Sequence, residues 1–147
     1  MTFVVSFTVE GDPHGKGRPR FRKFGNFVST YTDAKTKSYE LEVKFAARQA
    51  MGSSPPLEGP VRLDLIIKLP VPESYSKKRT QACLSGSEWP TKKPDWDNVA
   101  KSIADAMNDV VFVDDTQIVI ARVVKVYSAE SGVDVKVSEV LDGYTLY

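Results

Sequence analysis

Apolar and polar residues alternate in three stretches of the chain, and this period of two is typical of strands that bury one face. The three stretches are residues 1–10, 61–68 and 132–140. A fourth run, residues 118–127, is apolar almost throughout and also indicates a strand. In the first stretch only Ser6 and Thr8 interrupt the apolar character of the second face. We therefore expect both faces of that strand to be largely covered.

Helical spacing and turn residues predict two helices and a hairpin. The hairpin and the first helix lie between the strands at residues 1–10 and 61–68, and the second helix follows the latter strand. Residues 33–51 repeat apolar positions on one side and end before Gly52, a residue that commonly stops a helix. A short helix is predicted over residues 77–84. The Gly-Asn pair between Phe24 and Phe27 indicates a two-residue hairpin turn, with arms over residues 20–24 and 27–31.

A third helix is predicted to begin at Asn98. Pro94 should keep the helix from running through Asp95, and Asp97 suits the capping position. The core-facing stripe of this helix is formed by Val99, Ile103, Ala106 and Met107. After it, residues 110–113 are all apolar and predict a further strand. The element order predicts an α+β fold, with a mixed β-sheet and helices packed on it.

Length and composition are those of one globular domain spanning residues 1–147. Apolar residues make up 41% of the chain and charged residues 27%, and no apolar run approaches the length of a membrane span. The first ten residues lack the pattern of a signal peptide, and the single Cys83 has no second cysteine for an internal disulfide. Both observations favour a cytoplasmic protein.

The net charge of +1 conceals a division along the chain. Residues 1–93 carry 16 basic and 9 acidic side chains, whereas residues 94–147 carry 4 and 10. This division is typical of a protein that holds DNA with its first part and a metal ion with its second. Chance clustering of charge is the alternative.

Carboxylates gather around the third predicted helix. Asp95 and Asp97 precede it, two residues apart, which in an extended segment directs both side chains to one side. Asp114 and Asp115 follow it, and Lys101 lies one turn in from Asp97. Oxygen ligands without histidine or cysteine suit Mg²⁺ or Mn²⁺ rather than zinc. The alternative is structural, with Asp97 as a helix cap and the later pair in a solvated turn.

Basic residues concentrate in a loop rich in glycine and proline, residues 11–23, and upstream of the carboxylates. Arginine forks and glycine backbone amides suit phosphate oxygens, so the loop is either a phosphate clamp or a solvated loop. The predicted DNA-binding residues are Lys16, Arg18, Arg20, Arg22, Lys23, Lys77, Lys78, Arg79, Lys92 and Lys93. Trp89 and Trp96 flank the acidic site. They belong either to the core or to a surface that stacks on a distorted base.

At these motifs the sequence resembles the RusA family of Holliday junction resolvases, which are crossover junction endodeoxyribonucleases. Four parts of the chain are similar to that family's signature: the run Pro-Asp-Trp-Asp-Asn at residues 94–98, Lys101, the pair Asp105-Ala106, and the run Asp-Asp-Thr-Gln-Ile at residues 114–118. The Gly-Lys-Gly-Arg-Pro-Arg-Phe run at residues 15–21 is similar to the family's opening segment. The resemblance implies a catalytic set of three aspartates and one lysine, which here are Asp95, Asp97, Asp115 and Lys101. Asp114 is the alternative to Asp115.

The resemblance also implies the substrate and the assembly. Family members are homodimers that need a divalent metal ion and cut four-way DNA junctions. Whether one or two ions are bound, and whether the process served is recombination, repair or phage DNA processing, stays open. The alternative function is a DNA-binding module with a structural cation site and no activity. Lys101 favours the enzyme, because a structural carboxylate cage does not need an ammonium group.

Overall fold

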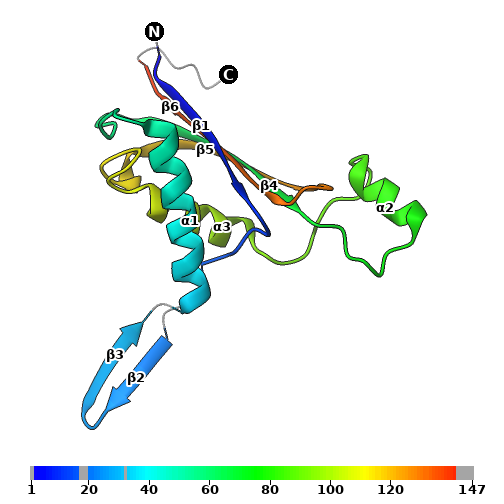
Figure 1. Ribbon diagram of the computed structural model, residues 1–147, viewed down its shortest axis with the longest axis horizontal. Coiled ribbons are helices and arrows are strands. Elements are labelled where there is room, and N and C mark those ends of the chain that lie inside the picture. The colour runs from blue at the N-terminus through cyan, green and yellow to red at the C-terminus, as the bar shows by residue number, and fades with distance from the viewer. Residues whose placement is uncertain (1, 17–19, 32, 142–147) are drawn as a thin grey trace.

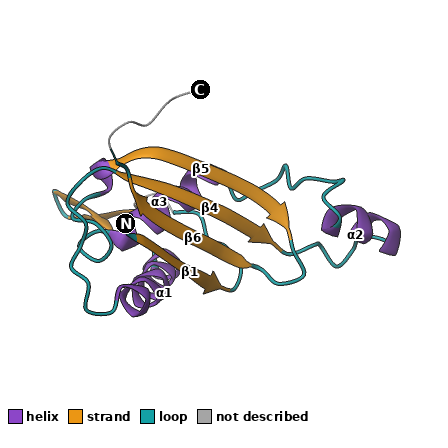
Figure 2. Ribbon diagram, turned by 90° about the horizontal axis from the view of Figure 1, so that it is seen from above, coloured by secondary structure: helices purple, strands orange, loops and turns teal. Residues whose placement is uncertain are grey.

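The central sheet has four strands in the order β1-β6-β4-β5 (Figure 2). The computed structural model describes residues 2–16, 20–31 and 33–141. The strands are β1 (Val4–Glu10), β6 (Gly132–Glu139), β4 (Val61–Leu69) and β5 (Ile118–Tyr127). β6 is antiparallel to both of its neighbours, whereas β4 and β5 run parallel. The mixed sheet and the α+β fold predicted from the sequence are confirmed.

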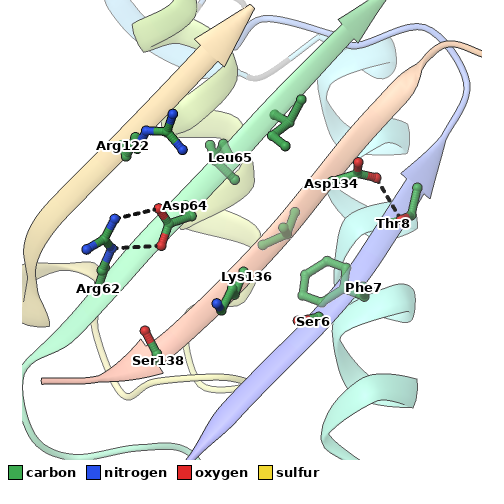
Figure 3. Close-up of a pocket in the computed structure, with 12 residues that line it drawn as sticks. Ser6, Phe7, Thr8, Arg62, Asp64, Leu65, Arg122, Asp134, Lys136 and Ser138 are labelled. Atoms are coloured by element: carbon green, nitrogen blue, oxygen red, sulfur yellow. Dashed lines mark hydrogen bonds and ion pairs between the residues drawn. The ribbon is translucent and has the colours of Figure 1, made fainter. Parts of the chain in front are cut away.

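Alternation along the strands separates a covered face of the sheet from an open one. On the covered face, the inward side chains of β4 and β6 are buried: Val61, Leu63, Leu65, Ile67, Val133, Val135 and Val137. The opposite positions carry charged residues, among them an ion pair between Arg62 and Asp64 (Figure 3). Thr8 donates a hydrogen bond to Asp134 on the same face (Figure 3).

The prediction that the second face of β1 is covered is wrong. Ser6 and Thr8 line an open hollow, and Val4 is 48% exposed. The reason is that the helices packed on the sheet lie against its other face (Figure 2). Apolar residues on the second face of this edge strand therefore did not show that a helix or another sheet covers that face.

Two helices, α1 (Ala34–Met51) and α3 (Trp96–Met107), pack side by side on the covered face. Asp33 caps α1 by accepting a hydrogen bond from the Thr36 amide at 2.8 Å. Gly52 ends the helix with a φ of 57°, a left-handed conformation that favours glycine. The predicted stripe of α3 is confirmed: Val99, Ile103, Ala106 and Met107 are all buried.

The start of α3 differs from the prediction. The helix begins at Trp96, and Asp95 holds the N-cap position with extended backbone angles. Proline restricts the residue before it, which is Lys93, so Pro94 leaves Asp95 free to initiate the helix. Asp97 therefore lies in the first turn of α3 and is not its cap.

Residues 110–113 form a turn rather than the predicted strand, with residues 110–112 buried and Val113 exposed. The amides of Val110 and Val111 both donate to the carbonyl of Met107, which folds the chain back onto the end of α3. Phe112 is fully buried and makes only isolated bridges, one of them to Leu57. The apolar run reflects burial, which a tight turn at the end of a helix also provides.

Two segments project from this body (Figure 1). The hairpin of β2 (Arg20–Phe24) and β3 (Phe27–Tyr31) has the predicted turn, with Phe24 opposite Phe27. The short helix α2 (Lys77–Leu84) lies beyond one end of the sheet and has the predicted bounds. In the part of the chain that the structure describes, no helix is long and apolar enough to cross a membrane.

Candidate active site

The N-terminal end of α3 presents two exposed carboxylates to one hollow. Asp95 and Asp97 both line it, together with Trp96 between them. The Asp95 side chain makes no capping hydrogen bond, although it stands at the N-cap. The structural alternative for Asp97, a helix cap, does not hold, because Asp97 lies inside the first turn. Both carboxylates are thus available to a cation.

Three lysines surround the same hollow. Lys92 and Lys93 come from the segment before α3, as the sequence predicted, and Lys125 comes from β5. The Lys125 ammonium donates a hydrogen bond to the carbonyl of Lys92 at 2.6 Å. Lys125 was missed in the sequence because it lies in an apolar strand far from the motif. A charged residue within the apolar run 118–127 was the only sign in the sequence that Lys125 faces solvent. The hollow therefore combines carboxylates for a cation with ammonium groups for a phosphate.

Lys101 lies beyond Asp97 on the same helix and contacts carboxylates on both sides. Its ammonium is 2.9 Å from Asp105 Oδ1 and 3.2 Å from Asp115 Oδ2. These hydrogen bonds, with Asp105 the larger contributor, raise the pKa of Lys101 above its ordinary value. The side chain nonetheless remains 57% exposed. Lys101 is thus a fixed positive charge that solvent and a bound strand can still reach.

The adjacent residues Asp114 and Asp115 have different partners. Asp114 caps the short helix η1 (Asp115–Gln117), accepting a hydrogen bond from the Thr116 amide at 3.2 Å. The Gln117 side chain completes this cap by accepting a hydrogen bond from the Asp114 amide at 2.9 Å. The hydrogen bond from the Thr116 hydroxyl lowers the pKa of Asp114. Asp115 instead accepts a hydrogen bond from the Lys101 ammonium.

The acidic residues are suited to a hard divalent cation. Within the described ranges, no three side chains of histidine, cysteine, aspartate or glutamate are close enough to hold an ion together. Mg²⁺ does not require three, since it is commonly bound by one or two carboxylates with water and substrate phosphates. Asp95 and Asp97 on one hollow fit this pattern.

The glycine-rich loop docks against the first turn of α3. The Lys16 amide donates a hydrogen bond to the carbonyl of Asn98 at 3.0 Å. A side-chain carbon on Gly15 would lie 3.1 Å from Cβ of Asn98, so glycine permits this close approach. The loop and Asp95 line a second hollow together. The loop is thus a wall of the site.

The predicted DNA-binding residues have varied surroundings. Lys16 is paired with Asp105 and Glu40, Arg18 lies outside the described residues, and Arg20, Arg22 and Lys23 lie on β2. Lys77 and Lys78 are exposed on α2, and Lys93 is exposed beside Asp95. The exposed lysines remain available to phosphate, whereas Lys16 is held by its own chain.

Arg79 and Lys92 take part in a cluster that stabilises the segment around α2. The Arg79 guanidinium donates to both oxygens of Glu88 and lies 3.6 Å from the ring centre of Tyr75. The Lys92 ammonium donates to the Tyr75 hydroxyl at 2.9 Å. These two cations therefore hold the segment in place before any DNA is bound.

Both tryptophans lie at the surface. Trp89 and Trp96 are each 58% exposed, so neither is a core residue. Trp96 lines the hollow that holds Asp95 and Asp97. An exposed ring beside clustered lysines is typical of a surface that stacks on nucleic-acid bases.

Comparison with known proteins places these features in a family. Residues 10–138 match the family described as "Endodeoxyribonuclease RusA". The chain is also 37% identical to the uncharacterized protein YqaN of Bacillus subtilis strain 168. The alignment is 138 residues long and covers 92% of this chain and 96% of YqaN.

Proposed function

Because the chain belongs to the RusA endodeoxyribonuclease family, we propose that it is a magnesium-dependent nuclease that resolves four-way DNA junctions. We place its active site at the N-terminal end of α3. The observation that carries this proposal is the pair Asp95 and Asp97, two exposed carboxylates that share a hollow with three lysines. Two carboxylates on one hollow suit a divalent cation, because Mg²⁺ is commonly bound by one or two carboxylates with water and substrate phosphates.

We assign Asp95 and Asp97 as the residues that would hold Mg²⁺, with Mn²⁺ as a substitute. Asp115 is not close enough to complete a set of three around one ion, so we assign it to the same metal chemistry through bound water or a second ion. When bound, the ion supplies Lewis-acid activation of water and of the phosphate. We leave Asp114 out of the set, because its carboxylate caps η1. The positive N-terminal end of α3 also lies at Asp95, and it favours the ionised carboxylates and a nearby phosphate.

The lysines of the site bind and orient the phosphodiester. Lys93 and Lys125 offset the repulsion between the aspartates and the DNA backbone. Lys101 holds its ammonium beside Asp115 and stabilises the charge that develops on phosphate oxygens in the transition state. Trp96 stacks on a base next to the cut, and this contact fixes the strand.

Branched DNA as substrate agrees with the outline of the molecule. The β2–β3 hairpin and the α2 segment extend in different directions from the body that carries α3 (Figure 1). The hairpin includes Lys23, and α2 includes Lys77 and Lys78. We propose that these projections contact separate duplex arms. A homodimer places one active site on each of the two strands that must be cut.

A DNA-binding module with a structural cation site is the alternative. Lys101 speaks against it, since an exposed ammonium beside Asp115 competes with a structural cation. The test uses a synthetic four-way junction and a linear duplex of matched sequence, each incubated with Mg²⁺ or EDTA. We expect cleavage of the junction alone and only with Mg²⁺. Binding without cleavage in Mg²⁺ and in Mn²⁺ would establish the alternative.

A further inference from the structure

Asp105 bridges two lysines that come from different parts of the chain. Its Oδ1 lies 2.9 Å from the ammonium of Lys101, one turn earlier on α3. Its Oδ2 accepts a hydrogen bond from the ammonium of Lys16 in the glycine-rich loop. The two oxygens of one carboxylate therefore connect Lys16, in the loop that lines the site, to Lys101 on α3.

Lys16 is held by three residues on two helices, α1 and α3. Besides Asp105, its ammonium is 3.4 Å from Glu40 Oε1 on α1. Its backbone amide is bonded to Asn98 in the first turn of α3. A residue fixed at both ends serves as a tether, and this tether sets the position of the loop against Asp95.

The charges of this cluster reinforce one another. The hydrogen bond to Asp105 raises the pKa of Lys16. Burial alone would raise the pKa of Asp105, but hydrogen bonds from Lys16 and then Lys101 outweigh it and lower that pKa. All three groups are therefore ionised at neutral pH.

Asp105 also restrains where Lys101 points. Lysine has a long flexible stem, and a carboxylate four residues later on a helix limits the region its ammonium visits. Lys101 contacts two carboxylates, those of Asp105 and Asp115, so without Asp105 the contact that remains of these two is the one to Asp115. Lys101 would then settle on Asp115 and compete for the oxygens assigned to the metal ion.

We propose that Asp105 is a positioning residue of the active site, which orients Lys101 and anchors the loop through Lys16. It does not itself touch DNA or metal. This inference rests on the proposed function, because the orientation of Lys101 matters for catalysis only if the protein cuts DNA. In the sequence, Asp105 shares a helix face with Lys101 and, with Ala106, belongs to the run that resembles the RusA signature.

The experiment compares Asp105→Asn with the wild type and with Asp64→Asn. The amide is nearly isosteric with the carboxylate. Asp64 is a matched control, because it is paired with Arg62 on the open face of the sheet and its side chain is 22% exposed, against 19% for Asp105. We expect single-turnover cleavage of the junction to fall roughly 10- to 100-fold in Asp105→Asn, with junction affinity nearly unchanged. Asp64→Asn should cut like the wild type.

A second measurement tests the tether independently of activity. Hydrogen exchange at the Lys16 amide should accelerate in Asp105→Asn and in Lys16→Met, since both release the loop from α3. The variant that combines Asp105→Asn with Lys16→Met should lose little more activity than Asp105→Asn alone, because both changes break the same network of Lys16, Asp105 and Lys101.

The outcomes separate this inference from the proposed function. If wild-type protein cuts no DNA with either metal ion, the proposed function fails. If the wild type cuts and Asp105→Asn cuts equally well, Asp105 has no positioning role. If Asp105→Asn loses junction affinity or melts far below the wild type, while exchange at Lys16 is unchanged, its role is general folding and the inference is overturned.

Discussion

Asp114 and Asp115 are adjacent in the chain, yet Asp114 accepts a hydrogen bond from the Thr116 amide while Asp115 faces the ammonium of Lys101. The sequence alone could not choose between them as a metal ligand. The turn into η1 separates them, because the N-cap residue directs its side chain back toward the helix it starts. Their different surroundings lead directly to a pair of variants.

Asp115→Asn should abolish cleavage, whereas Asp114→Asn should leave it nearly intact. The first change removes a charge that we assign to the metal ion. The second preserves an amide oxygen that still accepts a hydrogen bond from Thr116, so η1 keeps its cap. Single-turnover cleavage of a four-way junction in Mg²⁺ compares the two. Equal losses in both variants would contradict the assignment of Asp115 alone.

Replacing Lys101 with methionine should lower the cleavage rate by about 10² to 10³ with junction affinity nearly unchanged. The reason is that its ammonium acts on charge that develops only in the transition state. Single-turnover rates and the melting temperature of the metal-free protein are measured on the same variant. If Mg²⁺ restores full activity, Lys101 only offsets repulsion between carboxylates, and its catalytic role is wrong.

Changing Arg18 and Arg20 to alanine should weaken binding to junction and duplex alike. Each lost phosphate contact reduces the slope of log affinity against log salt by roughly 0.9 on duplex DNA. Lys136→Ala, on the open face of the sheet, is the control and should leave the slope unchanged. A double variant with the slope of the wild type would remove this basic segment from the DNA interface.

The stability contributed by Asp105 should be lost only in acid. Because its pKa in the folded protein lies below the ordinary 3.8, its ionised form stabilises the fold above that value, and the contribution disappears as pH falls through the lowered pKa. The difference in melting temperature between wild type and Asp105→Asn should therefore stay constant from neutral pH down to about pH 5. A difference that vanishes by pH 6 would contradict this.

Much of the fold could be predicted because its patterns are local. The alternation in β4, the Gly-Asn turn of the hairpin and the apolar stripe of α3 each reflect one element and one buried face. One prediction was wrong where buried apolar residues do not form the secondary structure that their pattern suggests. Residues 110–113 are as apolar as a strand but fold into a turn against the end of α3.

The candidate site could be predicted from the sequence only where its residues are close together in the chain. Asp95, Asp97 and Lys101 are close in sequence, and the element order explains why Asp115 returns to Lys101. Lys125 reaches the hollow through strand pairing, and Lys16 reaches Asp105 through a loop 89 residues away. Contacts of this kind depend on the packed fold, which periodicity does not encode.

The most direct test of the account is the cleavage rate of Asp97→Asn on a four-way junction in Mg²⁺, measured beside the wild type. Asp97 is exposed and is not the cap of α3, so the amide should preserve the fold, the melting temperature and junction binding. We predict that cleavage is abolished, because the variant loses a charge that holds the metal ion. Cleavage near the wild-type rate would show that the N-terminal end of α3 is not the active site.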